Sequence, residues 1–290
     1  MTARDLFFAG GTGGRLRAPW RLVGFALVAG LVLPVAMTAL GLARPSTAVG
    51  SMTVFSGAAV LALAAAHFVM VRVVDDLPWR AVWLDAAAAG PRPLGWGMAV
   101  GAAAIAVPGA ALLSAGWLEL VGAPGTAGDA VRYGVLMLAV LLPAAVWEEL
   151  LFRGYLLRVL RDAIGAWPAV LITGAAFGVA HVGNLASAPL LALVLVTLAG
   201  VLLGWIVLAR RSLYAAIAAH LAWNAVLVAG LHTEVSGAQL GAPPAYRVVD
   251  AGPDWATGGP WGPEGGLAAG AGLTAALLIT LSRRESREER

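Results

Sequence analysis

Residues 133–157 read YGVLMLAVLLPAAVWEELLFRGYLL, an apolar run that is interrupted near its end by two glutamates and an arginine. A helix of about 20 apolar residues crosses the hydrocarbon core of a bilayer. The length of the run therefore predicts a membrane-spanning helix. Its three charged residues, Glu148, Glu149 and Arg153, are the part of that helix that lipid contact does not explain.

The composition of the whole chain also fits a membrane protein. Of its 290 residues, 60% are hydrophobic and 12% are charged, and the mean hydropathy is +0.84. Soluble domains are about 45–50% apolar and about 25% charged, so a water-soluble enzyme and a disordered chain are both excluded. The predicted fold class is all-α, a polytopic transmembrane bundle of about eight helices. The further apolar segments are 20–42, 52–73, 94–120, 167–182, 189–209, 213–231 and 266–281.

The placement of arginine predicts the orientation of the bundle. All 19 basic residues are arginine, and they gather in every second connection, whereas the alternate connections hold only Arg44, Arg132 and Arg247. By the positive-inside rule, both termini are cytoplasmic. Because the arginines form no solvated patch, the lipid bilayer is an expected partner and nucleic acid is not.

Two residue types are missing from the chain. The absence of cysteine excludes disulfides, thiolate metal sites and a cysteine nucleophile. We attribute the absence of lysine to the codon usage of a GC-rich genome, which indicates a bacterial cytoplasmic (inner) membrane as the location.

Four regions follow along the chain. Residues 1–130 hold a cytoplasmic N-terminal segment and three helices, and residues 131–231 hold the four helices with chemically informative motifs. Residues 232–265 are rich in Gly, Pro and Trp, which predicts an irregular outer loop with tryptophans at the membrane interface. Residues 266–290 form the last helix and a charged cytoplasmic tail.

Charges inside a membrane helix are costly and indicate a functional site by default. Glu149 and Arg153 are four residues apart, so they share a helix face and can form an ion pair. Glu148 lies about 100° around the helix from Glu149, so it does not share that partner and is available for acid–base chemistry. The alternative is that the helix ends at Val146 and that both glutamates are solvated.

The four histidines fall into two groups. His220 and Asn224 are four residues apart and face the same way on one apolar segment, and His181 closes another. His67 and His232 have no polar companion at helical spacing. We therefore expect these two to be packing histidines bonded to neighbouring carbonyl groups.

The polar residues of three segments are predicted to lie at one depth. At 1.5 Å per residue, Glu148 lies about 15 Å and His181 about 21 Å from the cytoplasmic edge. His220 and Asn224 lie about 14 and 20 Å from it. We expect these four residues to converge near the middle of the bilayer, in a site open toward the cytoplasm.

Such a set of side chains suits hydrolysis by either of two mechanisms. A glutamate and a histidine can deprotonate a water molecule, while a second histidine and an amide stabilise the oxyanion. Alternatively, His181, His220 and Glu149 bind one Zn²⁺ with an open water position, and the other glutamate is the base. The residues alone do not separate these mechanisms. The His-Glu-x-x-His and Gly-x-Ser-x-Gly motifs of other proteases do not occur.

Three motifs occur in order, each within its own apolar segment: Glu148-Glu149-x-x-x-Arg153, Phe177-x-x-x-His181 and His220-x-x-x-Asn224. Together they closely resemble the motifs of the CPBP family, the CAAX-processing and bacteriocin-processing intramembrane endopeptidases related to type II CAAX prenyl proteases. The resemblance covers about residues 136–231. It implies that Glu148 and His181 activate water and that His220 and Asn224 stabilise the oxyanion. The family is also discussed as metalloproteases, so the resemblance leaves the zinc question open.

The expected activity is that of an intramembrane endopeptidase acting on a membrane-anchored peptide or protein. One alternative is a non-catalytic bacteriocin-immunity or scaffold membrane protein, in which the cluster is an interhelical polar network. Another is a proton-coupled transporter, although this predicts repeats and paired interrupted helices that the sequence does not show. The Gly174-x-x-x-Gly178 spacing predicts close helix packing under all three hypotheses.

Overall fold

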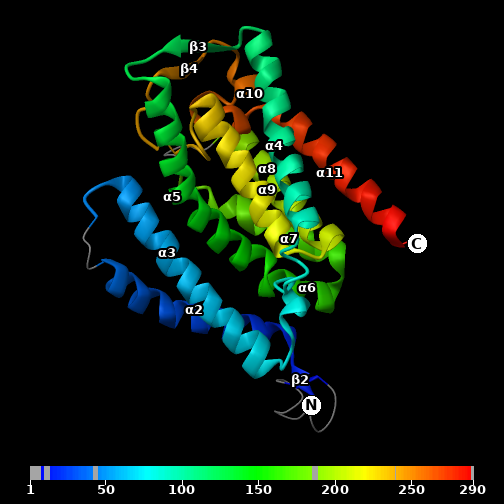
Figure 1. Cartoon of the computed structure of the whole chain (residues 1–290). Coiled ribbons are helices and arrows are strands. Elements are labelled where there is room, and N and C mark those ends of the chain that lie inside the picture. The colour runs from blue at the N-terminus through cyan, green and yellow to red at the C-terminus, as the bar shows by residue number, and fades with distance from the viewer. Residues whose placement is uncertain (1–7, 10–13, 42–44, 185–188, 239, 289–290) are drawn as a thin grey trace.

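The computed structural model describes residues 8–9, 14–41, 45–184, 189–238 and 240–288, and it confirms an all-α bundle (Figure 1). Among these residues, six helices are long and apolar enough to cross a membrane, and two shorter apolar helices accompany them. Arg44, used above for the orientation, lies outside the described residues. The helices that match the predicted segments are α2 (Ala18–Gly41), α3 (Ala48–His67), α4 (Pro91–Ser114), α5 (Ala127–Arg153), α7 (Ala166–Ala180), α8 (Leu190–Arg210), α9 (Leu213–Ala225) and α11 (Leu267–Glu288).

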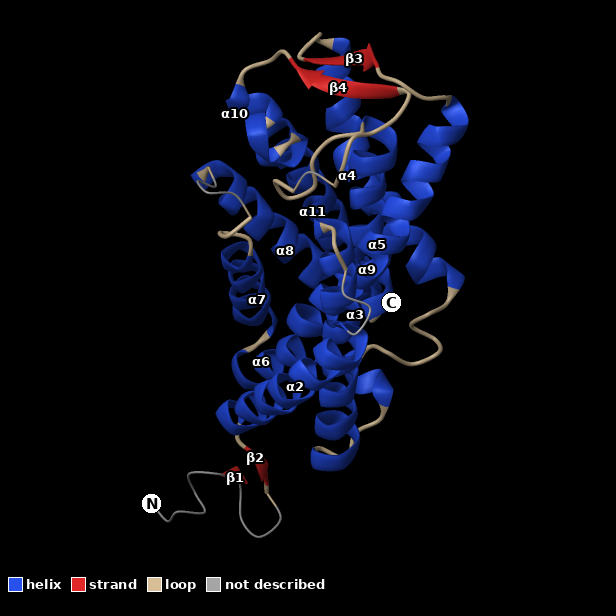
Figure 2. Cartoon of the chain, turned by 90° about the vertical axis from the view of Figure 1, so that its left-hand side faces the viewer, coloured by secondary structure: helices blue, strands red, loops and turns tan. Residues whose placement is uncertain are grey.

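Shorter elements extend or join these helices. Two π-helical turns continue α3 and α9, and an amphipathic helix follows α5 directly. Two small antiparallel pairs of strands lie at opposite ends of the molecule (Figure 2). These elements are η1 (Phe68–Val74), η2 (Trp79–Val82), α6 (Tyr155–Ile164), η3 (Val226–Leu231), α10 (Asp254–Thr257), η4 (Gly259–Trp261), η5 (Pro263–Gly265), β1 (Phe8–Ala9), β2 (Arg15–Leu16), β3 (Leu118–Gly122) and β4 (Tyr246–Asp250).

Both ends of α5 differ from the predicted segment 133–157. The helix begins at Ala127 because Thr126 and Asp129 form a capping box, in which the Asp129 carboxylate accepts the Thr126 N–H at 2.8 Å. It ends at Arg153, because the backbone at Gly154 leaves the helical region with φ −81° and ψ −118°. The glutamates therefore lie inside a continuous helix, and the alternative that this helix ends at Val146 is wrong.

A histidine from α3 stabilises the break between α5 and α6. His67 Nε2 accepts the N–H of Tyr155 at 3.0 Å, and its Nδ1–H is donated to the Leu63 carbonyl at 2.8 Å. A Cβ at Gly154 would overlap His67 Nε2, so only glycine allows this approach. The packing role that the sequence predicted for His67 is confirmed. His67 also accepts the backbone N–H of the first residue of α6, which has no partner within that helix.

Residues 232–265 are not an irregular loop. Part of this region forms β4, which pairs with β3. β3 lies in the predicted apolar segment 94–120, whose helix α4 therefore ends at Ser114 instead of continuing to residue 120. Trp261 is fully buried, which corrects the expectation of an interfacial position, whereas Trp255 is 57% exposed. His232 Nδ1–H is donated to the Tyr246 carbonyl at 2.9 Å, as expected for a packing histidine.

Glycines bring the central helices into backbone contact. On α4, a Cβ at Gly97 or Gly101 would overlap the carbonyl oxygen of Ala215 or Ala219 on α9. On α7, Gly174 and Gly178 lie against α8 in the same manner, which confirms the close packing predicted from their spacing. These contacts fix the rotation and depth of α9, the helix that carries His220 and Asn224.

Gly101→Val is expected to destabilise the bundle by about 1–3 kcal/mol or more, because the larger side chain must push α4 away from α9. Gly95→Val is the matched control, since a Cβ at Gly95 meets nothing within 4 Å. Thermal unfolding in detergent should show a lowered midpoint for Gly101→Val alone. Equal midpoints for both variants would contradict the close contact.

Candidate functional site

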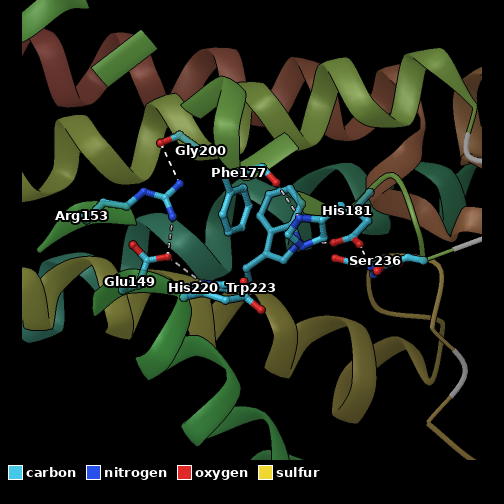
Figure 3. A network of polar contacts seen from close by, with 11 residues as sticks. Glu149, Arg153, Phe177, His181, Gly200, His220, Trp223 and Ser236 are labelled. Carbon is cyan, nitrogen blue, oxygen red and sulfur yellow. Dashed lines mark hydrogen bonds and ion pairs between the residues drawn. The ribbon is translucent and has the colours of Figure 1, made fainter. Parts of the chain in front are cut away.

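The site is built on a buried ion pair at the end of α5. Arg153 Nη1 donates to Glu149 Oε1 at 3.0 Å, and neither side chain is exposed. Arg153 Nη2 donates to the Gly200 carbonyl of α8 at 3.0 Å, and the guanidinium lies 4.3 Å from the ring centre of Phe177 on α7 (Figure 3). The pairing predicted from the four-residue spacing is confirmed, and it ties three helices together.

Glu149 also orients His220 on α9. The two groups lie 3.0 Å apart, between His220 Nδ1 and Glu149 Oε1. The carboxylate already accepts the Arg153 guanidinium, so the imidazole is the donor through Nδ1–H. His220 Nε2 then lies 3.9 Å from Glu148 Oε2 and is the ring nitrogen left for other contacts.

His181 is fixed in the same way by its own helix. It is the C-terminal cap of α7, and its Nδ1 lies 2.8 Å from the Phe177 carbonyl oxygen. Because a carbonyl can only accept, Nδ1 carries the proton and Nε2 has a free lone pair. The imidazole also packs against the Phe177 ring, with the ring centres 4.6 Å apart.

One cavity of about 250 Å³ brings the predicted site residues together. Glu148 from α5, His181 from the end of α7, and His220 and Asn224 from α9 all line it. Glu148 Oε2 is buried and has no hydrogen-bond partner within the described part of the chain. The structure therefore brings these four side chains to one cavity, whereas their depth in the bilayer stays a prediction.

Sequence reasoning missed three residues near this site. A tight turn, in which Val235 pairs with Ala238, lines the cavity. Asn184 Nδ2 donates a hydrogen bond to the Ser236 carbonyl in this turn at 2.9 Å. Glu264 accepts the backbone N–H of Ser236. The spacing of three residues between His181 and Asn184 could have indicated that Asn184 lies near the site. No pattern in residues 232–265 indicated that this connection folds back against the bundle.

Glu264 anchors the turn to α9. Its Oε2 accepts Nε1–H of Trp223 at 2.8 Å, while its other oxygen holds Ser236. The side chain is buried, and this burial raises the pKa of Glu264 above its usual range, against the opposing effect of the two hydrogen bonds. A second cavity, of about 50 Å³, is lined by Trp223 and Glu264 and shares His220, Asn224 and Ser236 with the first.

The direction in which the cavity opens differs from the prediction. A site open toward the cytoplasm would be lined by the connections that follow α6 and α8. Instead, the lining includes Asn184, Val235, Ser236, Ala238 and Leu240, which belong to the connections after α7 and η3, at the other end of the bundle. Helix rise, from which the depth was predicted, says nothing about which connection folds inward.

The proposed zinc ligands are each held by protein partners through one atom. Glu149 Oε1 already binds both Arg153 and His220, and His181 Nδ1 is held by a carbonyl group. Within the described residues, no three His, Cys, Asp or Glu side chains are grouped so that they could hold a metal ion. The hydrogen bonds at Nδ1 leave Nε2 of both imidazoles available, as in metal-binding histidines, so a zinc site formed by His181, His220 and Glu149 stays a prediction.

Comparison with known proteins supports the resemblance seen in the motifs. Residues 130–226 match the family described as type II CAAX prenyl endopeptidase Rce1-like. This segment, about a third of the chain, is similar to that family. No curated protein and no solved structure matches the chain. The matched segment contains α5 to α9 almost entirely. The six long apolar helices among the described residues indicate an integral membrane protein.

The Glu264 anchor predicts a pH-dependent stability. Because its pKa in the folded state is raised, the folded chain holds this proton more tightly than the unfolded chain. Stability contributed by Glu264 should therefore fall as the pH rises above the ordinary value of 4.5, by up to about 1.4 kcal/mol per pH unit. Glu264→Gln, which keeps the shape of the side chain, should remove this slope in thermal unfolding measured in detergent. An unchanged slope would contradict the assignment.

Proposed function

We propose that the protein is an intramembrane endopeptidase that hydrolyses peptide bonds of membrane-associated proteins or peptides. The observation that carries the proposal is the cavity that gathers Glu148, His181, His220 and Asn224 within an otherwise apolar bundle. The family of residues 130–226 supports the same reaction class. Polar groups at membrane depth are costly, and a hydrolytic site accounts for all four of them.

Glu148 and His181 are the groups proposed to activate water. Glu148 Oε2 has no hydrogen-bond partner among the described residues, and His181 offers Nε2, since its Nδ1–H is donated to Phe177. A water molecule between them loses a proton to Glu148 as its oxygen attacks the peptide carbonyl carbon. When the tetrahedral intermediate collapses, the C–N bond breaks and Glu148 returns the proton to the leaving amine.

His220 and Asn224 are proposed to stabilise the oxyanion of that intermediate. They lie one turn apart on α9 and line the same cavity. The Asn224 amide donates a hydrogen bond, and so does Nε2–H of His220 when the ring is protonated. Glu149 is then a positioning residue, since it holds His220 Nδ1–H while its charge is balanced by Arg153.

Substitutions in the cavity should separate these roles. Glu148→Gln and His181→Ala should each lower kcat by roughly 10²–10⁴-fold, and Asn224→Ala by about 10²-fold or more. The assay is cleavage of fluorogenic membrane-tethered peptides by purified protein in proteoliposomes. Ser56→Ala is the matched control, because Ser56 lines the same cavity outside the proposed machinery. Wild-type cleavage by Glu148→Gln would defeat the proposal.

Chelation is a second, independent test. Since the proposed activation of water by Glu148 and His181 requires no metal ion, we expect full cleavage after prolonged treatment with a strong zinc chelator. Metal analysis of the same preparation should find zinc well below one equivalent. Loss of activity that added Zn²⁺ restores would show that the water is activated by metal.

A further inference from the structure

We propose, in an inference that rests on the proposed protease function, that Ser236 is a further catalytic residue. Its hydroxyl donates a hydrogen bond to the oxyanion of the tetrahedral intermediate, and Glu264 is the positioning residue that holds it there. Both residues lie outside residues 130–226, the segment that is similar to the CAAX endopeptidases. Three observations carry the proposal: the place of Ser236 between two cavities, the bonding of its backbone, and the conformation of its turn.

Ser236 lies where the two cavities of the site meet. The cavity of about 250 Å³ contains Glu148 and His181, and the cavity of about 50 Å³ is lined mostly by apolar side chains. Three of the described residues line both cavities: His220, Asn224 and Ser236. The first two are the proposed oxyanion donors of α9. A substrate carbonyl oxygen that lies between them therefore also borders Ser236.

The backbone of Ser236 is held on both sides, while its hydroxyl is left over. Its N–H is donated to Glu264, and its carbonyl oxygen accepts Asn184 Nδ2–H at 2.9 Å. Glu264 also accepts Nε1–H of Trp223 at 2.8 Å, which ties the turn to the residue before Asn224 on α9. Within the described part of the chain, the hydroxyl of this half-buried serine makes no hydrogen bond, so it is available to a substrate.

The conformation of the turn favours residues other than serine. Val235 and Ala238 pair across two central residues, Ser236 and Gly237, whose φ angles are +49° and +73°. Positive φ at both central positions is typical of a type I′ turn, whose first central position favours Asn, Asp or Gly. A residue that conflicts with its local conformation indicates a functional site. The proposed role of the hydroxyl accounts for serine at this position.

A hydroxyl supplies a donor that the acid–base groups do not compete for. His220 Nε2 lies 3.9 Å from Glu148 Oε2, so this carboxylate competes with the oxyanion for the same ring nitrogen. The serine hydroxyl is neutral, and its hydrogen rotates to suit its acceptor. Donors aimed at developing negative charge stabilise the transition state more than the ground state. Ser236 forms no covalent bond with the substrate, since water remains the nucleophile.

Ser236→Gly isolates the hydroxyl from the fold. Glycine readily adopts positive φ, so the midpoint of thermal unfolding in detergent should not fall. For a membrane-tethered fluorogenic peptide, kcat should fall by roughly 10²-fold with KM nearly unchanged, because the lost hydrogen bond forms in the transition state. Ser56→Ala, which removes another hydroxyl from the larger cavity, is the matched control and should keep the wild-type kcat. A wild-type kcat in Ser236→Gly would overturn the role of Ser236.

Binding of a tetrahedral analogue measures the same contact without turnover. A phosphinic peptide carries an anionic oxygen at its tetrahedral centre, whereas the matched reduced peptide, with CH₂ in place of the carbonyl group, has no oxygen there. Ser236→Gly should weaken the phosphinic peptide at least tenfold and leave the affinity for the reduced peptide unchanged, as measured by calorimetry in detergent. Equal weakening of both peptides, or of neither, would contradict the proposal.

Glu264→Gln tests the positioning role. Its amide offers one acceptor oxygen where the carboxylate offers two, so either Ser236 or Trp223 loses its partner. The substitution should lower kcat by about tenfold in the wild-type background, as expected for the loss of one hydrogen bond. It should have little further effect in Ser236→Gly, because it acts through the hydroxyl. Fully additive losses in the double variant would show that Glu264 does not act through Ser236.

The same assays separate this proposal from the proposed function. If the wild type cleaves the peptide and Glu148→Gln does not, the protease function stands even when Ser236→Gly cleaves normally, and only the role of Ser236 is refuted. If the wild type cleaves no membrane-tethered peptide and binds the phosphinic peptide no more tightly than the reduced one, both proposals are refuted.

Discussion

The buried ion pair between Glu149 and Arg153 is the interaction on which the rest of the site depends. Two charges at membrane depth are tolerated only when they are paired. Here Arg153 reaches Glu149 on its own helix and Gly200 on α8, while Glu149 also holds His220 on α9. One pair therefore fixes the relative positions of three helices and the tautomer of an imidazole.

The break after Arg153 connects this pair to the N-terminal helices. His67 of α3 accepts the N–H of Tyr155, and the Tyr155 hydroxyl donates to Asp75 at 2.8 Å, where Arg21 of α2 completes a buried network. The first helices lie outside the segment that matches the family, yet they hold the end of the helix that carries both glutamates. We interpret them as part of the scaffold of the site and as one wall of its cavity.

Predictions from the sequence succeeded where the signal is local. The helical character of α5 around the glutamates, the Glu149–Arg153 pair and the shared face of His220 and Asn224 follow from apolar length and four-residue spacing. They failed where the decisive contact is distant in the chain. Glu264 is 28 residues from Ser236 and 41 from Trp223, so no local pattern relates them.

The sequence by itself determined that this chain is a membrane bundle, which helix carries the glutamates, and which four polar residues gather at one depth. It did so because membrane helices are uniform rods, in which residue spacing converts directly into height and face. Only the tertiary structure decided which groups are already engaged and which way the cavity opens. Those properties depend on connections that fold back into the bundle, and a returning connection such as the turn at Ser236 is positioned by contacts with helices far away in the sequence.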